Sequence, residues 1–198
     1  MREVSGRLNF EGRELNPLDE ESIIKAVQEL VDDGVTRLAV CLLHSYANNI
    51  HEARTAEIVQ EHFPNLFVSL SSTVLPEYRE YERAMTTLID VMVKPYCKTY
   101  LNHAASEIRK KSGEIPFLIM QSNGGVVSNA AAGKKPVTML LSGPAAGVLG
   151  ASFMSDLGNE KNILTLDVGG TSTDVSLVEN LEPQLTSNAL VENYPGKT

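Results

Sequence analysis

Cysteine is scarce in this sequence, and several other common features are missing. The 198 residues include two cysteines, Cys41 and Cys97, and no Cys-x-x-Cys pair. Buried, reduced thiols and a cytoplasmic location are therefore expected. No apolar run is long enough to cross a bilayer, and the start at Met1 lacks the apolar core of a signal peptide. We therefore expect no membrane as a partner.

Basic residues are also in short supply. The chain carries 17 Lys and Arg against 25 Asp and Glu, which gives a net charge of −8. No basic patch stands out, so nucleic acid is not expected as a partner. The hydrophobic share of 42% and the charged share of 21% are typical of a globular protein. The length allows one large or two small domains.

Strand and helix patterns alternate in the first part of the chain. Asp19 precedes a helical apolar pattern that Gly34 ends, as an N-cap and a C′ glycine would. Residues 38–43 form an apolar run typical of a parallel strand buried on both faces, and residues 66–70 predict a further strand. This alternation indicates the α/β class.

A loop rich in charged and aromatic residues, 76–83, comes before a long amphipathic helix. Arg79 and Arg83 lie among glutamates, which favours a solvated ion-pair network over a substrate contact. Pro95 lies inside the helical pattern and is expected to kink the helix or split it in two. The apolar side chains recur on one face: Met85, Leu88, Ile89, Met92, Val93, Tyr96, Tyr100, Leu101, Ala104 and Ile108.

The most informative run lies near the C-terminus, where two apolar strands flank Gly169-Gly170. Residues 163–178 are predicted to form a β-hairpin, because a glycine pair supplies the positive φ angles that a tight turn needs. No Lys follows the glycines, as it would in a P-loop, and a strand follows them where a Rossmann motif has a helix.

Polar residues around that turn predict a phosphate cradle. The glycines let backbone N–H groups approach an anion, and the hydroxyls of Thr171 and Thr173 add donors. Asp167 is placed to hold a hydrated Mg²⁺. Asp174 either orients the loop or caps the turn. The alternative interpretation is a plain hairpin with a polar surface turn.

Three further segments each have two interpretations. Ser142 or Gly143 is expected to cap a helix, with Pro144 at its first position. The N-terminus of this helix either attracts an anion, or the helix packs tightly against its neighbours through its small residues. Residues 121–125 line a substrate cleft or form a simple turn. His44 and the pair His51-Glu52 are metal ligands or, as we favour, ordinary satisfied side chains.

Four segments together resemble the hydantoinase A/5-oxoprolinase family, and a fifth, 40–46 followed by His51-Glu52, looks like it too. In chain order the four are Leu75–Arg83, Met120–Gly125, Leu141–Val148 and Asp167–Val175. The resemblance implies an α/β chain with an incomplete actin-like ATPase (ribonuclease H-like) fold, in which helices flank mixed sheets. Residues 1–80 would be the C-terminal part of the family's N-terminal domain, and residues 81–198 the N-terminal part of the hydantoinase A domain.

The resemblance also implies a function, namely part of an ATP-dependent hydrolase that acts on cyclic amides such as hydantoin or 5-oxoproline. ATP and Mg²⁺ would be the cofactors, and a hydantoinase B-type subunit or domain a partner. Asp167 would hold the metal, and the nucleotide phosphates would contact Gly169, Gly170, Thr171, Thr173, Asp174, Ser142 and Gly143.

Only one of the family's two phosphate hairpins is found in the sequence, and the adenosine-binding segment is missing. We therefore expect an internal piece of a longer protein that is catalytically silent alone. The alternatives are an acetone-carboxylase-type subunit, a non-catalytic fragment, or another actin-like ATP-binding module of the sugar-kinase or chaperone kind. Neither the ring substrate nor a catalytic residue is indicated.

Overall fold

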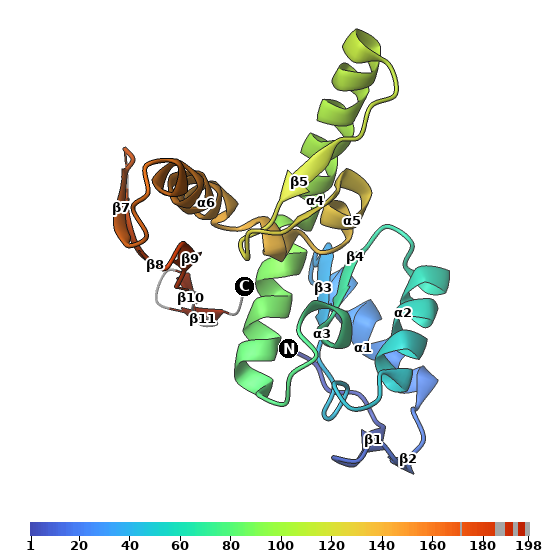
Figure 1. Ribbon diagram of the computed structural model, residues 1–198. Helices are drawn as coiled ribbons and strands as arrows, with labels where there is room; N and C mark the ends of the chain where they lie inside the picture. Colours follow the sequence, from blue (N-terminus) through green and yellow to red (C-terminus); the bar gives the residue numbers. More distant parts are fainter. Residues whose placement is uncertain (171, 185–188, 192–193, 197–198) are drawn as a thin grey trace. The chain divides into compact units, whose positions relative to one another are not determined.

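The computed structural model describes residues 1–170, 172–184, 189–191 and 194–196. They form two compact units (Figure 1). The first comprises residues 1–97 and the short C-terminal strand pair, and the second comprises residues 98–188. The division falls inside a long helix and not at residue 80, so the expected domain boundary stays a prediction. Among the described residues, no helix is both long and apolar enough to cross a membrane.

The first unit is built around a two-stranded parallel sheet. Strands β3 (Arg37–Val40) and β4 (Phe67–Leu70) pair in register from Arg37 opposite Phe67 to Val40 opposite Leu70. The crossover between them contains α2 (Ile50–His62), as a parallel pair requires. The remaining elements are β1 (Arg7–Leu8), β2 (Glu14–Asn16), α1 (Glu20–Asp32), α3 (Ser71–Val74), the first part of α4 (Glu80–Ser112), β10 (Ala189–Val191) and β11 (Tyr194–Gly196).

Local sequence signals set the ends of α1. The Asp19 carboxylate accepts hydrogen bonds from the backbone N–H groups of Glu21 and Ser22, which have no partner inside the helix. Gly34 follows the helix with φ of 83°, the left-handed conformation of a C′ residue. Both expectations for this helix are confirmed.

The core of the first unit lies between α1, α2 and one face of the sheet. Ile23 and Val27 from α1 meet Ile58 and Val59 from α2, and all four are buried. The next residue along β4 from the core-facing Val68 is Ser69, whose hydroxyl donates to Asp90 of α4 at 2.6 Å. Because successive side chains of a strand alternate between faces, α4 covers the other side of the sheet.

Helix α4 settles one of the two alternatives for Pro95. It continues as one helix through Pro95, so it is not split, and the kink stays a prediction. In its first half the apolar face is not the buried one, because the residues without solvent exposure include Arg83, Thr87 and Asp90.

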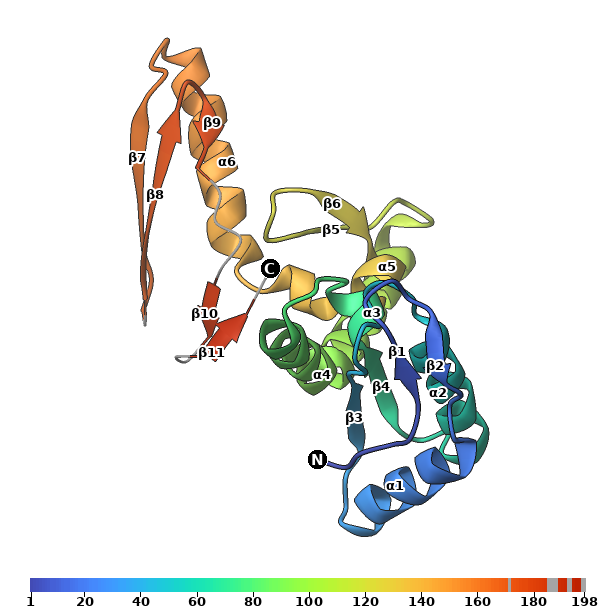
Figure 2. The ribbon, with the colours of Figure 1, turned by 90° about the horizontal axis from the view of Figure 1, so that it is seen from below.

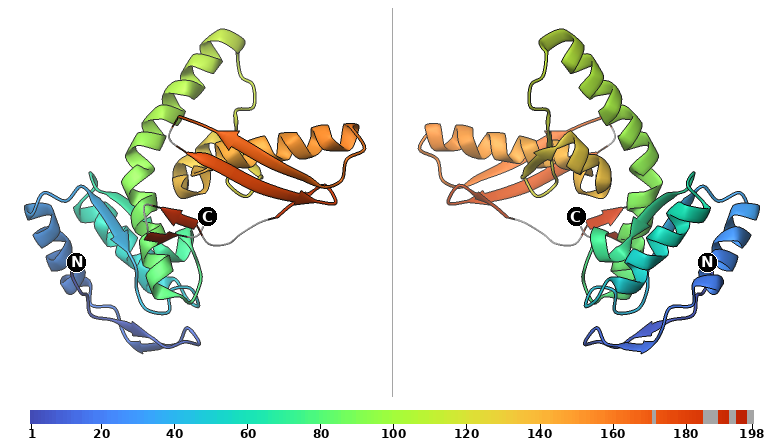
Figure 3. Two further views of the ribbon diagram at one scale, coloured as in Figure 1. Left: turned by 90° about the vertical axis from the view of Figure 1, so that its left-hand side faces the viewer. Right: turned by 90° about the vertical axis from the view of Figure 1, so that its right-hand side faces the viewer.

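The second unit contains a helix laid along a hairpin. Helix α6 (Ser142–Leu157) contacts strands β7 (Ile163–Val168), β8 (Thr173–Glu179) and β9 (Glu182–Pro183), which form one antiparallel sheet in that order, as Figure 2 and Figure 3 show. Before it come the hairpin of β5 (Leu118–Met120) and β6 (Val126–Ser128), α5 (Asn129–Lys134) and the short 3-10 helix η1 (Pro136–Met139).

The start of α6 corrects one expectation. Its N-cap is Leu141, in the left-handed conformation with φ of 63°, and no side chain caps the helix. Ser142 and Gly143 already lie inside the helix, and Pro144 is its third residue. The chain arrives extended at Leu140, so the reversal into the helix happens one residue before the predicted cap.

Candidate functional site

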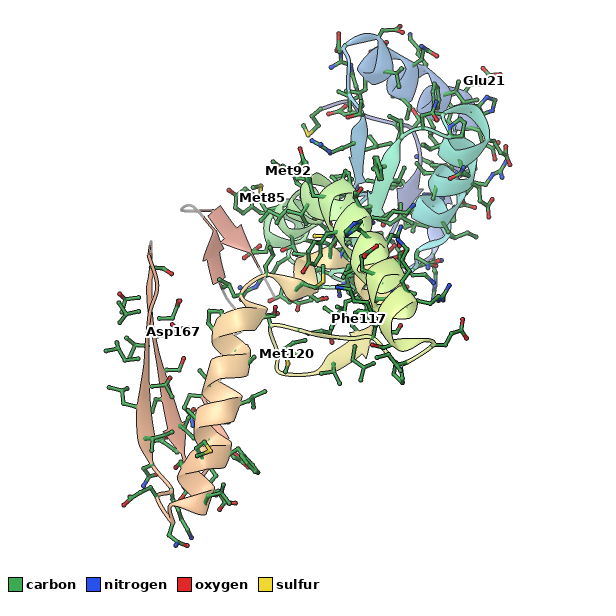
Figure 4. The ribbon with its side chains drawn as sticks, turned by 90° about the horizontal axis from the view of Figure 1, so that it is seen from above. Glu21, Met85, Met92, Phe117, Met120 and Asp167 are labelled. Carbon is green, nitrogen blue, oxygen red and sulfur yellow. The ribbon has the colours of Figure 1, made fainter. Side chains whose placement is uncertain are left out.

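The predicted hairpin is present, and its register brings two carboxylates together. Asp167 of β7 is directly opposite Asp174 of β8 at the loop end of the pair, and Thr165 is opposite Ser176 one step further from the loop. Side chains of the same parity in opposed positions share a face. This face of the hairpin therefore carries Ile163 at the end far from the loop and the hydroxyls of Thr165 and Ser176 in the middle. The carboxylates of Asp167 and Asp174 lie at the loop end. Figure 4 labels Asp167.

The loop is longer than expected. Val168 pairs with Thr173, so residues 169–172 form the connection, and the Gly169 N–H donates to the Ser172 carbonyl at 2.9 Å. Neither Gly169 nor Gly170 has a positive φ, so the predicted left-handed glycines are wrong. A two-residue turn needs that conformation at its central residues, whereas here the two glycines lie in a longer connection between Val168 and Thr173. Thr171 lies outside the described residues.

Gly170 nevertheless has a steric property that fits the predicted chemistry. A Cβ atom placed there would meet nothing within 4 Å, so no described part of the chain requires glycine at this position. The missing side chain leaves the backbone open to an incoming group.

A pocket of about 660 Å³ separates α6 from the hairpin. The hairpin contributes Asp167, Asp174 and Ser176 to its lining, and α6 contributes Pro144, Gly147 and Ala151 among others. The small side chains of Gly147 and Ala151 leave room on the helix side. This volume is within the range of small-molecule sites.

The electrostatics of the pocket favour a cation. Two like charges directly opposite each other on an antiparallel pair repel. A divalent ion beside Asp167 and Asp174 would remove that repulsion. No group of three or more His, Cys, Asp or Glu side chains among the described residues is placed to hold a metal. Such an ion would therefore take its remaining ligands from water or from a bound anion.

The structure brings some of the predicted site residues together and separates others. Asp167 and Asp174 line the pocket. Thr173 is exposed at the end of β8, and Ser142 and Gly143 begin α6 without lining the pocket. Three further residues line the pocket that were not predicted from the sequence: Thr165, Ser176 and Gly147. The alternation of the strands was the signal that placed Thr165 and Ser176 on the face of the two acids.

The segment 121–125 forms the turn between β5 and β6. Gly124 has φ of 83°, and the Asn123 side-chain oxygen accepts from the Gly125 N–H at 2.9 Å. The Gln121 side chain donates to the Thr138 hydroxyl. These contacts agree with the simple turn among the two interpretations.

Arg83 overturns the expectation of a solvated ion-pair network. It is fully buried in the first unit, and its guanidinium donates to the backbone carbonyls of Glu77 at 2.6 Å and Leu42 at 3.2 Å. It also lies over the ring of Tyr46, 5.5 Å from the centroid. Arg79 does form a solvated ion pair, with Glu82. The helix turns Arg83 inward because two carbonyls at the strand and loop ends need donors.

His51 and Glu52 have structural partners. Glu52 is fully buried and accepts from the Leu42 N–H, the Ser72 N–H and the Ser71 hydroxyl at 2.6 to 2.9 Å. It thereby joins the ends of β3 and β4. The His51 ring contacts the Glu14 carboxylate at 2.7 Å. This agrees with the favoured interpretation of satisfied side chains.

Cys97 is not poised as a nucleophile. Burial, together with the nearby negative charge of Asp90, raises the pKa of its thiol. A raised pKa leaves less of the reactive thiolate at neutral pH.

Comparison with known proteins identifies relatives over most of the chain. A family model described as Hydantoinase/oxoprolinase matches residues 83–198, and one described as Hydantoinase/oxoprolinase N-terminal region matches residues 1–63. The chain is 38% identical to 5-oxoprolinase 1 of Arabidopsis thaliana over 166 residues, which are 83% of this chain and 13% of that protein. It is 30% identical to caprolactamase subunit alpha of Pseudomonas jessenii over 176 residues, covering 89% of this chain and 25% of that subunit.

Solved structures of acetone carboxylase and caprolactamase also resemble this chain. A nucleotide-free acetone carboxylase structure superposes with a TM-score of 0.89 at 27% identity, covering 98% of this chain and 28% of that one. The ATP-dependent caprolactamase of Pseudomonas jessenii superposes with a TM-score of 0.74 at 28% identity, covering 89% and 26%. The predicted fold class, an incomplete actin-like ATPase fold of mixed sheets flanked by helices, is confirmed. The chain spans about a quarter or less of the length of these relatives.

Proposed function

Since the chain belongs to the hydantoinase/oxoprolinase family, we propose that it forms part of an ATP-dependent enzyme that hydrolyses cyclic amides of the hydantoin or 5-oxoproline type. The observation that carries the proposal is the pair of opposed carboxylates, Asp167 and Asp174, at the loop end of the pocket. The relatives named 5-oxoprolinase and caprolactamase support the class of reaction. The acetone carboxylase and the caprolactamase whose structures match are both described as ATP-dependent.

The two carboxylates fit Mg²⁺ by their chemistry. This ion prefers oxygen ligands, keeps several waters, and is commonly held by one or two carboxylates together with substrate phosphates. We assign Asp167 to the metal, with Asp174 opposite it as a second carboxylate. When bound, the ion neutralises phosphate charge during phosphoryl transfer.

The loop supplies the complementary part of the site. The backbone at Gly170 is open to an approaching phosphate, because no side chain covers it. The Gly169 N–H is held by the Ser172 carbonyl, which fixes the shape of the loop before a ligand arrives. Thr171 and Thr173 are proposed to add hydroxyl donors. Ser142 and Gly143, at the first turn of α6, are proposed to contribute backbone N–H groups.

An acetone-carboxylase-type subunit is a second candidate, and one observation favours it. The superposition on acetone carboxylase has the higher TM-score, 0.89 against 0.74 for caprolactamase. Both functions would use the same ATP site, so they differ in the substrate and not in the role of Asp167. Assaying the same purified protein with a cyclic amide and with a ketone plus bicarbonate distinguishes them.

A partner subunit is part of the proposal. Caprolactamase subunit alpha is named as one subunit of an assembly. We propose that the protein containing this chain likewise works with a hydantoinase B-type subunit or domain. We also propose a cytoplasmic location, and we expect the 198-residue chain alone to hydrolyse neither ring, because an isolated half-site loses the positioning that phosphoryl transfer needs.

The test uses the full-length protein that contains this segment. We expect Asp167→Asn to lower Mg-ATP hydrolysis at least about 100-fold, the scale seen when one preorganised electrostatic group is removed from an active site. Phosphate release with hydantoin or 5-oxoproline is the measurement. Asp156→Asn is the matched control, because Asp156 is an exposed carboxylate on α6 that does not line the pocket. Unchanged hydrolysis in Asp167→Asn would remove this carboxylate from the site.

A further inference from the structure

Strands β8 and β9 of the second unit are joined by a strained turn. Its two residues, Asn180 and Leu181, both have positive φ, 52° and 68°. Two-residue hairpin turns of the I′ type need this conformation at both positions, and glycine is the usual residue at the second. Leucine is strained there, because its Cβ atom crowds the backbone when φ is positive. Such a conformation persists only where the surrounding structure holds it.

The surrounding structure holds this turn by three hydrogen bonds. The Asn180 N–H donates to the Asn162 side-chain oxygen, and the Leu181 N–H donates to the Lys161 carbonyl, both at 2.9 Å. The Leu181 carbonyl accepts from the hydroxyl of Ser152 on α6 at 2.7 Å. Ser152 is buried, with 8% exposure. These three bonds, here called the turn anchor, join one end of the hairpin to α6 and to the residues before β7.

The hairpin separates from α6 with distance from the turn anchor. On the face that carries Asp167, Val178 beside the anchor is fully buried, Thr165 is partly buried, and Asp167 at the loop end is exposed. Among the described residues, no hydrogen bond joins residues 142–151 of α6 to β7 or β8. In Figure 2, α6 and the hairpin meet near β9 and diverge toward the loop between β7 and β8. The hairpin is therefore attached to the helix at one end only.

The angle between the hairpin and α6 decides whether the two parts of the proposed phosphate site can meet. Asp167 and the open backbone of Gly170 lie at the loop end of the hairpin, whereas Ser142 and Gly143 lie in the first turn of α6. Because the hairpin is attached at its other end, a small change of angle at the turn anchor moves the loop by a larger distance. A misplacement of about 1 Å can cost about 100-fold in rate.

We infer that Ser152 is a positioning residue of the proposed nucleotide site, and that it sets the angle between α6 and the hairpin through the Leu181 carbonyl. This inference rests on the proposed function. Ser152 does not line the pocket, so it acts through the hairpin and not by contact with the ligand. Without its hydroxyl the Leu181 carbonyl loses its donor, the strained turn relaxes, and the hairpin samples several angles.

A nucleotide that needs one angle then binds more weakly. The apparent dissociation constant rises in inverse proportion to the population of the binding-competent angle, whereas the complex, once formed, is the same. The effect therefore belongs to the KM for ATP and not to kcat. Loss of folded enzyme has the opposite signature, a lower kcat with an unchanged KM.

The experiment measures ATP hydrolysis with hydantoin or 5-oxoproline by the full-length protein that contains this segment. Ser152→Ala is expected to raise the KM for ATP at least about tenfold, with kcat changed less than about twofold. Ser152→Thr keeps the hydroxyl and is expected to restore most of the affinity. The matched control is Ser22→Ala, which removes a hydroxyl that donates to the Asp19 carbonyl in the first unit, also at 2.7 Å. Its KM is expected to stay unchanged.

A second pair of variants tests the turn anchor from the surface, where substitution is not expected to prevent folding. Asn162 is exposed and does not line the pocket, but its side-chain oxygen accepts from the Asn180 N–H. We expect Asn162→Ala to raise the KM by a smaller factor, and Asn162→Asp, which keeps the acceptor oxygen, to leave it near the wild-type value. Hydrogen exchange without nucleotide should be faster at the Asn180 and Leu181 amides in Ser152→Ala and Asn162→Ala.

The outcomes separate this inference from the proposed function. A raised KM with kcat preserved in Ser152→Ala, and unchanged constants in Ser22→Ala, supports it. A lower kcat with an unchanged KM overturns it, and so does slow exchange at the turn in Ser152→Ala. If Ser152→Ala does not fold, the Asn162 pair decides by the same criteria.

The variant Asp167→Asn shows which of the two proposals has failed. An unchanged KM in Ser152→Ala and Asn162→Ala, together with loss of hydrolysis in Asp167→Asn, overturns the role of Ser152 and leaves the proposed function standing. Hydrolysis that is absent from the wild-type protein, or unaffected by Asp167→Asn, overturns both.

Discussion

The two units of the molecule bury their apolar side chains to different extents. In the first, Ile23, Val27, Ile58 and Val59 form a closed core with exposures of 4% or less. In the second, Leu164, Leu166 and Val168 of β7 are 65% to 69% exposed, on the face of the hairpin opposite to that of Asp167. Burial is what makes an apolar side chain stabilising. We therefore expect the first unit to contribute most of the free energy of unfolding, and the second, which carries the candidate site, to contribute less.

Glu52→Ala tests how much the buried contacts of the first unit stabilise it, and we expect the largest effect here. Three donors, from Leu42, Ser71 and Ser72, would lose their acceptor inside the first unit. At about 1–3 kcal/mol for each buried group left unpaired, we expect a loss of about 4 kcal/mol in the free energy of unfolding. Urea unfolding followed by circular dichroism measures it.

Glu52→Gln is the control, since it keeps an acceptor oxygen and nearly the same shape, and its cost is expected to be smaller. A loss under about 1 kcal/mol for Glu52→Ala would mean that water replaces the carboxylate, and that the link between β3 and β4 matters little.

A pair of apolar truncations compares the two units directly. Ile58→Ala removes a side chain that is 2% exposed, and we expect it to cost about 3 kcal/mol. Leu166→Ala removes one that is 65% exposed, and in the 198-residue chain we expect a change under about 0.5 kcal/mol. Both are measured by urea unfolding. Equal losses in the free energy of unfolding for the two variants would contradict the difference in burial between the core of the first unit and the exposed face of β7.

The smallest expected effect concerns the two acids of the candidate site. Asp174→Asn removes the charge opposite Asp167, so the 198-residue chain should gain about 0.5 kcal/mol in stability at neutral pH and low salt. The gain should shrink as added salt screens the repulsion. Thermal melts at two ionic strengths measure it, and a loss of stability would show that Asp174 holds the loop by hydrogen bonding instead.

The sequence predicted those features that depend on neighbouring residues. Asp19 and Gly34 set the ends of α1 through contacts within a few positions. The two apolar runs around Gly169-Gly170 predicted the hairpin at residues 163–178, whereas the pairing of Asp167 with Asp174 came from the register of the structure. The length of the loop was not predicted, because a glycine pair is compatible with both a two-residue and a four-residue connection.

Helix α4 shows what the sequence does not determine. Its periodicity separates an apolar face from a polar one, but it does not say which face is buried. That choice depends on the carbonyls of Glu77 and Leu42, which receive Arg83, and on Ser69, which contacts Asp90. These partners lie up to 41 positions away in the chain. Tertiary contacts thus override the simple rule that the apolar side of a helix faces inward.

The position of Asp167 has a consequence for solubility. In the part of the chain that the structure describes, β7 pairs with β8 alone, so its other edge has free N–H and C=O groups beside an exposed aliphatic face. Such an edge is a template for pairing between molecules, and a charged residue on it is the usual protection. Asp167 is the only charged residue from Ile163 to Val168. The same carboxylate that is proposed to hold a metal thus also acts as a gatekeeper against aggregation, and removing its charge would affect both roles.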